Sequence, residues 1–353
     1  MSTQKIKAID AIQEAQKIAF APFVFQAVVS LRKLGVLSLI FDKRKKGGIT
    51  VEAIADALEI SAYGVGVLLE IAESSNIVSK DDTGHYEITT IGYYLNYHET
   101  VNVNINFTNE ICYKGLFHLD EAIKTGKPEG LKELGDWKTI YEGLSQLTPS
   151  QQKSWFEFDH HYSDDIFSEA LEQVFKKDRK TIFDIGANTG KFTIKCCNFD
   201  DDVNITMIDL PGQLNKARAN VKKEGFDNRV DSHEINWLSE NPEIPSGAET
   251  IWMCQFLDCF SKEEILKVLK TCVNSMDENS ELIIVETFTD RQKFDNAKFI
   301  LEATSLYFTV LANGNSKMYK ATEFKEIASQ AGLKIKKDLA IGEYHTMFTF
   351  SKS

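Results

Sequence analysis

The sequence predicts an α/β protein in which a parallel β-sheet wrapped by helices follows a helical N-terminal third that ends in a winged helix. Two patterns predict this fold. The first third places apolar residues at helical spacing and closes with two short alternating runs around a polar turn. From Thr181 onward, short β-branched runs alternate with helical patterns. The length of 353 residues agrees with two domains, since one domain usually takes about 100–200 residues.

The first two expected helices span residues 5–20 and 23–40, with Pro22 placed where one can end and the next begin. Gly35 lies near the end of the second helix. The apolar stretch over 18–40 is longer than a small winged helix can bury alone. We therefore expect these helices to intertwine with a partner chain in a homodimer.

The next segment has the signals of a winged helix. Thr50 can cap a short helix, and Ser61 can cap a second one over Tyr63 to Ser74. The alternating runs at 77–80 and 85–88 flank a polar turn and predict a hairpin.

A winged helix is most often a DNA reader, but the charges of this one oppose that role. Its second capped helix carries no basic residue, and residues 20–95 hold 7 basic and 9 acidic side chains. The basic run at 43–46 is interpreted as a solvated loop. The whole chain has 52 acidic and 40 basic residues, a formal charge of -12, which repels phosphate backbones. We expect no nucleic-acid partner and favour a structural or dimer-forming module.

Composition and cysteine usage indicate the compartment. Apolar residues make up 43% of the chain and charged residues 26%, close to the globular average. The longest nearly apolar stretch, Ala19 to Leu31, is shorter than the roughly 20 residues that cross a bilayer, and the N-terminus does not resemble a secretory signal. Six cysteines without a Cys-x-x-Cys pair favour reduced, buried thiols. We expect a cytoplasmic protein with no membrane partner.

Seven strands are expected in the last half of the chain. Their ranges are 181–186, 204–209, 229–235, 249–257, 281–288, 333–340 and 344–351. The last two are joined by a short connection at Gly342, which predicts an antiparallel hairpin at one edge of the sheet.

The first strand runs into a glycine-containing turn that indicates a ligand. Gly186 and Gly190 let the backbone bend and approach a bound molecule, and Asn188 tolerates a left-handed conformation. The spacing does not fit a phosphate-binding P-loop, and a dinucleotide fingerprint lacks its second and third glycines. The remaining interpretation is a turn against which S-adenosylmethionine lies, with Asp184 meeting the ligand's amino group.

A second acid, Asp209, ends the next strand, where a carboxylate can accept hydrogen bonds from both hydroxyls of a ribose. Its distance from the glycine turn supports the S-adenosylmethionine interpretation.

With these residues in place, the chain resembles the S-adenosylmethionine-dependent O-methyltransferases of plant phenylpropanoid and bacterial polyketide pathways. The likeness covers nearly the whole chain and runs through Leu31 to Val36, Thr50 to Ala57, Tyr86 to Thr89, the glycine turn, Ile208 to Pro211, Asn228 to Val230 and Phe324 to Gly332. It implies a winged-helix dimerisation domain over 1–105, connecting helices of the acceptor pocket over 106–176, and a Rossmann-like class I methyltransferase domain over 177–353.

The resemblance also implies a cofactor pocket. Its residues would be Asp184, Gly186, Asn188 and Gly190 at the amino-acid end, Asp209 and Leu210 at the ribose, and Asn236 and Trp237 at the adenine. Asn236 falls on the family's adenine-reading Gly-Asp pair and can hydrogen-bond through its amide. Trp237 could stack on the ring.

The family's base motif, Leu-His-Asp-Trp, is the main departure. It aligns with residues 257–260, so the catalytic histidine is Asp258. Of the two acids that orient that histidine, one matches Glu286 and the other falls on Met318. A carboxylate is a weak base toward a phenol unless burial raises its pKa. Five outcomes stay open: Asp258 as base, another residue as base, an acidic acceptor that needs little help, C-methylation of a phenolic ring, or a cofactor-binding regulator without methyl transfer.

The acceptor is expected to be a small, flat aromatic or polyketide-like molecule. By placement in the family, its pocket would be lined by Phe107, Phe158, His161, Met253, Phe299, Tyr307 and Met318. His160 with Asp164, and His161 with Asp165, stand at helical i,i+4 spacing. Adjacent histidines point about 100° apart on a helix, so we expect no metal. The sequence therefore predicts a homodimeric methyltransferase, and oxygen is favoured as the atom that receives the methyl group.

Overall fold

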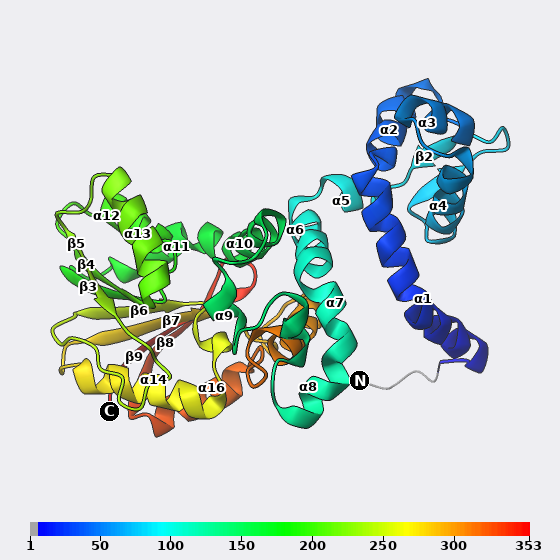
Figure 1. The fold of residues 1–353 in the computed structure, drawn as a ribbon. Helices are drawn as coiled ribbons and strands as arrows, with labels where there is room; N and C mark the ends of the chain where they lie inside the picture. Colours follow the sequence, from blue (N-terminus) through cyan, green and yellow to red (C-terminus); the bar gives the residue numbers. More distant parts are fainter. Residues whose placement is uncertain (1–5) are drawn as a thin grey trace. The chain divides into compact units, whose positions relative to one another are not determined.

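The computed structural model describes residues 6–353 and divides into two compact units (Figure 1). The first unit ends at Asn109 and the second begins at Glu110. The helices expected as a separate connecting segment over 106–176 are therefore grouped with the sheet from Glu110 onward.

The first unit begins with one long helix rather than two. Its elements are α1 (Ala8–Lys33), α2 (Val36–Lys43), η1 (Arg44–Lys46), α3 (Val51–Leu58), α4 (Ala62–Ser74), β1 (Val78–Lys80), β2 (Tyr86–Ile88), α5 (Thr90–Tyr97) and α6 (Glu99–Phe107). The expected break at Pro22 is wrong, because α1 continues through that proline. Proline removes a single backbone donor, whereas Gly35 adopts a left-handed φ of 77° and turns the chain into α2.

The winged helix is confirmed. The Thr50 hydroxyl accepts a hydrogen bond from the Ala53 amide at 3.3 Å and caps α3, and Ser61 caps α4 in the same way at 3.4 Å. Strands β1 and β2 pair antiparallel, and an isolated bridge joins Ile49 to Tyr86. Apolar side chains from α1 to α4 and the hairpin form the core of this unit.

Residues 9–23 of α1 expose an apolar surface. Its exposed large side chains are Ile9, Ile12, Ile18, Phe20 and Phe23. Between residues 6 and 353, no single helix has the length and apolar character to cross a membrane, although the bent pair Ala8–Lys33 and Val36–Lys46, at 67°, meets the test on length and composition.

The second unit surrounds one seven-stranded sheet. The short helix η2 (Thr108–Cys112) crosses the boundary between the two units. The helical elements that follow it and precede the sheet are α7 (Tyr113–Gly115), η3 (Leu116–His118), α8 (Leu119–Thr125), η4 (Glu129–Glu133), α9 (Ile140–Gly143), α10 (Pro149–Ser163), η5 (Asp164–Ile166) and α11 (Phe167–Val174). The remaining elements are β3 (Thr181–Ile185), α12 (Lys191–Phe199), β4 (Asn204–Asp209), α13 (Pro211–Lys223), β5 (Val230–Glu234), β6 (Thr250–Cys254), η6 (Leu257–Cys259), α14 (Lys262–Ser275), β7 (Glu281–Glu286), α15 (Asp295–Tyr307), η7 (Phe308–Ala312), α16 (Ala321–Gln330), β8 (Leu333–Ile341) and β9 (His345–Lys352).

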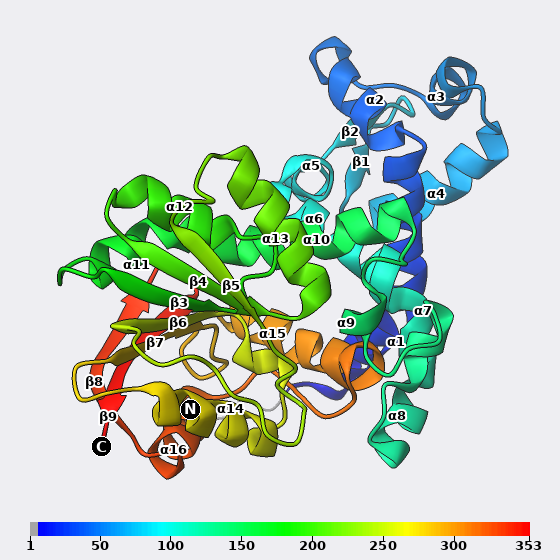
Figure 2. The ribbon, with the colours of Figure 1, turned by 60° about the vertical axis from the view of Figure 1, so that its left-hand side comes forward.

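The strand order is β5-β4-β3-β6-β7-β9-β8. The first five strands are parallel, and β9 pairs antiparallel with both β7 and β8. The expected edge hairpin is confirmed, with its second strand inserted next to β7. Helices α11 to α13 cover one face of the sheet, and α14 and α16 cover the other (Figures 1 and 2). This is the Rossmann-like class I methyltransferase fold.

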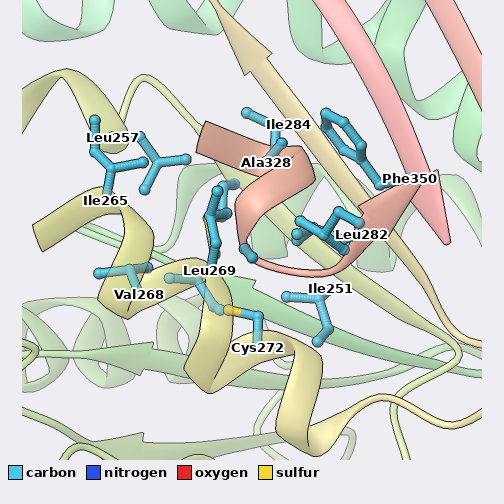
Figure 3. Close-up of a cluster of buried hydrophobic side chains, with 14 of the residues drawn as sticks. Ile251, Leu257, Ile265, Val268, Leu269, Cys272, Leu282, Ile284, Ala328 and Phe350 are labelled. Atoms are coloured by element: carbon cyan, nitrogen blue, oxygen red, sulfur yellow. The ribbon is translucent and has the colours of Figure 1, made fainter. Parts of the chain in front are cut away.

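Alternation along β6 and β7 divides the core between the two faces. Ile251 and Met253 pack with α14 and α16 in the cluster of Figure 3, whereas Trp252 faces α11 and α12. The Trp252 ring stacks on Phe192 with centroids 4.2 Å apart. Met253, expected to line the acceptor pocket, is therefore a fully buried core residue beneath α14.

Strand β6 ends at Cys254, earlier than the expected 249–257. Gln255 adopts a left-handed φ of 46°, and the amides of Phe256 and Leu257 donate to the Glu286 carboxylate instead of to a neighbouring strand. The Glu286 side chain thus takes the place of a neighbouring strand as the hydrogen-bond partner of these amides, and the chain leaves the sheet after Cys254.

Candidate active site

The site lies where the strand order reverses. β3 has β4 on one side and β6 on the other, and the carboxyl ends of these parallel strands meet at one edge of the sheet. Open α/β sheets bind ligands in the crevice at such a point. A cleft at this edge is lined by Asp159, His160, Ser163, Asp164, Phe167, Asp184, Ile185, Gly186, Ala187, Asn188, Thr189, Lys191, Phe192, Trp252, Cys254 and Gln255.

The glycine turn forms a bend that accepts no side chain. Gly186 has a φ of 73°, and a β-carbon there would lie 2.6 Å from Cδ2 of Phe256. Gly190 has a φ of 80°, and Asn188 adopts the expected left-handed conformation at 49°. The Gly186 amide donates to the Ile208 carbonyl at 3.0 Å, which ties the bend to β4.

Asp209 is fixed at the end of β4 by two backbone amides. Its Oδ2 accepts from Asn188 N at 2.8 Å, and its Oδ1 accepts from Leu210 N at 2.6 Å. Burial raises its pKa to about 6, against the lowering effect of these two bonds. Each carboxylate oxygen has two lone pairs, so both retain capacity for a diol.

Asp184 borders the cleft, but its carboxyl group turns inward. The residue is only 2% exposed, and its Oδ2 accepts a hydrogen bond from the Thr193 hydroxyl at 2.6 Å. Burial raises its pKa to about 7. This hydrogen bond ties β3 to α12 and engages one of the two oxygens of the carboxylate that the sequence assigned to the ligand's amino group, a role that stays a prediction.

Asn236 and Trp237 follow β5. The Oδ1 atom of Asn236 accepts from Leu238 N at 3.0 Å, so this exposed side chain shapes a turn. Trp237 is 4% exposed and meets the edge of Phe256 at a centroid distance of 5.9 Å. The Trp237 ring belongs to a buried apolar cluster and packs against Phe256, which itself contacts Gly186 of the glycine turn. In this position the ring stabilises the turn and is largely covered from an adenine.

Asp258 and Glu286 form a buried acid pair. Asp258 lies on η6 and is 9% exposed, and Glu286 ends β7 at 3% exposure. One oxygen of Glu286, Oε1, accepts from the amides of Phe256 and Leu257 at 3.0 and 2.9 Å. Burial raises the pKa of Asp258 to about 7, and burial together with the charge of Asp258 raises the pKa of Glu286 well above its usual range.

Phenol and thiol groups surround this acid pair. Burial raises the pKa values of Tyr141, Cys259 and Tyr307 well above their usual ranges, so all three stay protonated at neutral pH. The Trp155 indole donates to the Tyr307 hydroxyl at 3.0 Å. The Cys259 thiol donates a hydrogen bond to Asp258 Oδ1 at 3.5 Å, and its raised pKa disfavours the thiolate form.

The residues that the sequence assigned to the acceptor pocket differ in burial and in their neighbours. Tyr307 is buried near the acid pair, and Met318 is half-buried, with its sulfur 3.9 Å from the Thr287 hydroxyl. Phe299 is 66% exposed on α15. Two more, Phe158 and His161, pack against the Tyr162 ring. Phe107 belongs to the first unit, so its role at the acceptor stays a prediction.

His160 and Asp164 form an ion pair at 3.6 Å, but residues 6–353 contain no group of three or more His, Cys, Asp or Glu side chains that could hold a metal. Of the cleft residues named above, sequence reasoning assigned only Asp184, Gly186 and Asn188 to the cofactor, and Asp159 and Gln255 are among those it missed. Asp159 lies on a helix far from the glycine turn in sequence, and no local motif marks a glutamine that adopts a positive φ.

Two family models match the chain. One is described as a dimerisation2-like domain and covers residues 13–86. The other is described as an O-methyltransferase domain and covers residues 117–334, more than half of the chain.

Curated relatives are distant. The chain is 20% identical over 153 residues to 3-hydroxy-5-methyl-1-naphthoate 3-O-methyltransferase of Streptomyces sahachiroi, and the match spans 43% of each chain. It is 21% identical over 299 residues to O-methyltransferase 4 of Dictyostelium discoideum, covering 82% of this chain and 81% of that one. The match to the naphthoate enzyme thus spans less than half of that relative's length.

Solved structures share the fold. The mitomycin 7-O-methyltransferase MmcR has a TM-score of 0.74 at 16% identity, over 98% of both chains. The O-methyltransferase NcsB1 from neocarzinostatin biosynthesis, solved with S-adenosylmethionine and 2-hydroxy-5-methyl naphthoic acid, has a TM-score of 0.69 at 19% identity, over 93% of this chain and 96% of that one.

Proposed function

The chain belongs to the O-methyltransferase family of S-adenosylmethionine-dependent enzymes, and from that premise we propose that it methylates a hydroxyl group of a small aromatic or polyketide-like acceptor. One observation carries this proposal. The glycine turn at Gly186, the Asp209 carboxylate and the Asp258–Glu286 pair all lie at the same edge of the sheet.

The residues present fit S-adenosylmethionine. The turn residue Gly186 lines the cleft and packs so closely on Phe256 that only glycine fits there, and Asp209 offers a fixed carboxylate where a ribose diol would lie. Leu210 and Asn236 lie beside these groups at the ends of β4 and β5. The bound cofactor supplies a methyl group on a positively charged sulfur. Asp159 in the wall of the cleft, and Asp209 bonded to the cleft residue Asn188, favour a cationic ligand there.

Asp258 is the proposed general base. Its burial brings its pKa to about 7, so a large fraction is ionised at neutral pH, and the group is still basic enough to accept a proton as a hydroxyl oxygen becomes a nucleophile. An unperturbed carboxyl, with a pKa of about 4, would be a much weaker base toward a phenol of pKa about 10.

Glu286 is the proposed partner that sets the basicity of Asp258. Because burial and the charge of Asp258 raise the pKa of Glu286 well above its usual range, we assign the proton that the pair retains at neutral pH to Glu286. Its Oε1 stays anchored by two backbone amides, so the group keeps its position while the proton of the acceptor passes to Asp258.

The acceptor class rests on the surroundings of the acid pair and on the relatives. The indole of Trp155 and the phenols of Tyr141 and Tyr307 offer flat, largely apolar surfaces. A relative named for a hydroxy-naphthoate, and a similar fold solved with a hydroxy-naphthoic acid, support an aromatic hydroxyl as the nucleophile.

Incubation with methyl-labelled S-adenosylmethionine and a panel of hydroxynaphthoates, catechols and hydroxyquinones tests the proposal. We expect label on an oxygen atom of at least one acceptor, assigned by NMR of the product. Label on a ring carbon would instead identify a C-methyltransferase. Tight cofactor binding without transfer to any acceptor would favour the non-methylating regulator.

A further inference from the structure

Asp159 is a partly buried acid on the wall of the cofactor cleft that neither the sequence pattern nor the acid pair explains. It lies in the C-terminal half of α10, and its Oδ2 accepts a hydrogen bond from the Asn188 side-chain amide at 2.9 Å. The backbone amide of Asn188 donates to Asp209 at 2.8 Å. Asn188 thus couples Asp159 to the glycine turn and to the predicted ribose site.

The cations of the cleft are already paired with a different acid. Lys191 Nζ lies 2.6 Å from one oxygen of Asp164, and His160 Nδ1 lies 3.6 Å from the other. No positively charged side chain within residues 6–353 forms an ion pair with Asp159, whose side chain accepts its hydrogen bond from a neutral amide. Burial raises the pKa of Asp159, and a bound cation would offset that effect.

The inward turn of Asp184 leaves the amino group of the ligand without its expected acceptor. Asp184 is 2% exposed and bonds Thr193, whereas Asp159 lines the same cleft with a more accessible carboxylate. On another wall, α12 begins at Lys191, and the first amides of a helix carry partial positive charge. The cleft therefore has an acidic wall and a positive wall, which complements a zwitterionic amino-acid group.

We propose that Asp159 binds the α-ammonium group of S-adenosylmethionine, with Asn188 holding its carboxylate in position. The inference rests on the proposed function and assigns to α10 a recognition role for the cofactor beyond its place over the acceptor. Asp159 then determines specificity for the amino-acid end of the ligand, and the chemistry stays with Asp258.

Calorimetric titration of the full chain with S-adenosylhomocysteine and its analogue lacking the α-amino group tests the assignment. In the wild type, we expect the analogue to bind about tenfold or more weakly, because a charge-assisted hydrogen bond is lost. In Asp159→Asn, which preserves side-chain shape, that ratio should fall below about threefold, because S-adenosylhomocysteine loses the partner of its ammonium group and the analogue has no ammonium group to lose one.

Asp165→Asn is the matched control, because it removes one negative charge from an exposed position one turn beyond α10. This variant should keep the wild-type ratio. An unchanged ratio in Asp159→Asn would overturn the assignment, and so would equal weakening of both ligands, which indicates that Asp159 acts only on the shape of the turn. If the wild type binds neither ligand, the proposed function itself fails.

Discussion

Asp258 is the single residue on which the proposed chemistry depends most. We expect Asp258→Asn to lower kcat by about 10²–10³, the usual contribution of a general base, with little change in KM. Below the pKa of about 7 the wild-type base is protonated, so kcat should fall about tenfold per pH unit on the acid side and level off above pH 8.

The control for this prediction is Glu263→Gln, which neutralises an exposed acid at the start of α14. Steady-state rates from pH 5.5 to 9 with a confirmed acceptor give both profiles. A pH-independent wild-type rate, or an Asp258→Asn enzyme with the same inflection near pH 7, would exclude Asp258 as the base.

At the scale of elements, Gly186 in the turn after β3 should not tolerate replacement by a residue with a side chain. Gly186→Ala combines a positive φ of 73° with a β-carbon 2.6 Å from Phe256, so either that ring or the backbone must move. We expect a loss of about 1–3 kcal/mol in stability and weaker cofactor binding. Thermal unfolding and calorimetry measure the two effects.

Gly212→Ala is the matched control for that bend. Gly212 lies in the first turn of α13, where a β-carbon meets nothing within 4 Å, and it has no positive φ. This variant should be neutral or slightly stabilising, because alanine favours the helix. Equal behaviour of the two variants would contradict the proposed role of the bend.

Elements with local signals were predictable from the sequence, and elements that depend on distant contacts were not. The caps at Thr50 and Ser61, the glycine turn and the edge hairpin all follow from short patterns. The end of β6 did not follow, because it depends on a carboxylate contributed by β7. Hydrogen bonds from a residue distant in sequence leave no local pattern.

The same reason explains the site residues. Asp209 and Asp258 could be proposed from the sequence because each ends or follows a strand at a spacing shared with the family. The hydrogen bond of Asp184 depends instead on Thr193, and that of Asp159 on Asn188, which lie in other parts of the fold. Residue identity gave the candidates for the cleft, and only tertiary structure distinguished which carboxylates face it.

At the scale of the whole molecule, buried acids should make stability fall as pH rises. Asp184, Asp209 and Asp258 have folded pKa values of about 7, 6 and 7, above the unfolded value of about 4. The folded state therefore binds more protons between pH 4 and 7, and its stability decreases across this window. His345 has a folded pKa of about 4, so it makes stability rise with pH up to its unfolded pKa of about 6.5. The three aspartates outweigh this single histidine, and the net effect is a decrease in stability.

Chemical unfolding of the ligand-free protein at pH 5, 6, 7 and 8 measures this dependence. We expect the unfolding free energy to decrease from pH 5 to 8. Asp184→Asn, which can still accept the Thr193 hydrogen bond, should reduce the slope. A stability that rises over this range would contradict the raised pKa values.

The exposed apolar surface of α1 predicts a homodimer. Ile18 is 76% exposed and Phe23 68% exposed, in a segment matched by a dimerisation2-like domain model. Replacing both with Glu should weaken dimerisation by roughly 10²–10⁴-fold, since burial of each side chain contributes about 1.5–3 kcal/mol. Light scattering after size exclusion should give a dimer for the wild type and a monomer for the variant.

Gln16→Glu, on an exposed position of the same helix, adds charge without removing an apolar side chain and should remain dimeric. A wild-type monomer, or a double variant that is still a dimer, would exclude α1 as the interface.

A crystal structure with S-adenosylhomocysteine tests the central claim most directly. We expect the ligand in the cleft at the carboxyl edge of the sheet, with both ribose hydroxyls donating to Asp209 within about 3 Å and the amino-acid portion over Gly186. A cleft that stays empty at saturating ligand, or that binds a nicotinamide or a nucleotide phosphate instead, would contradict it.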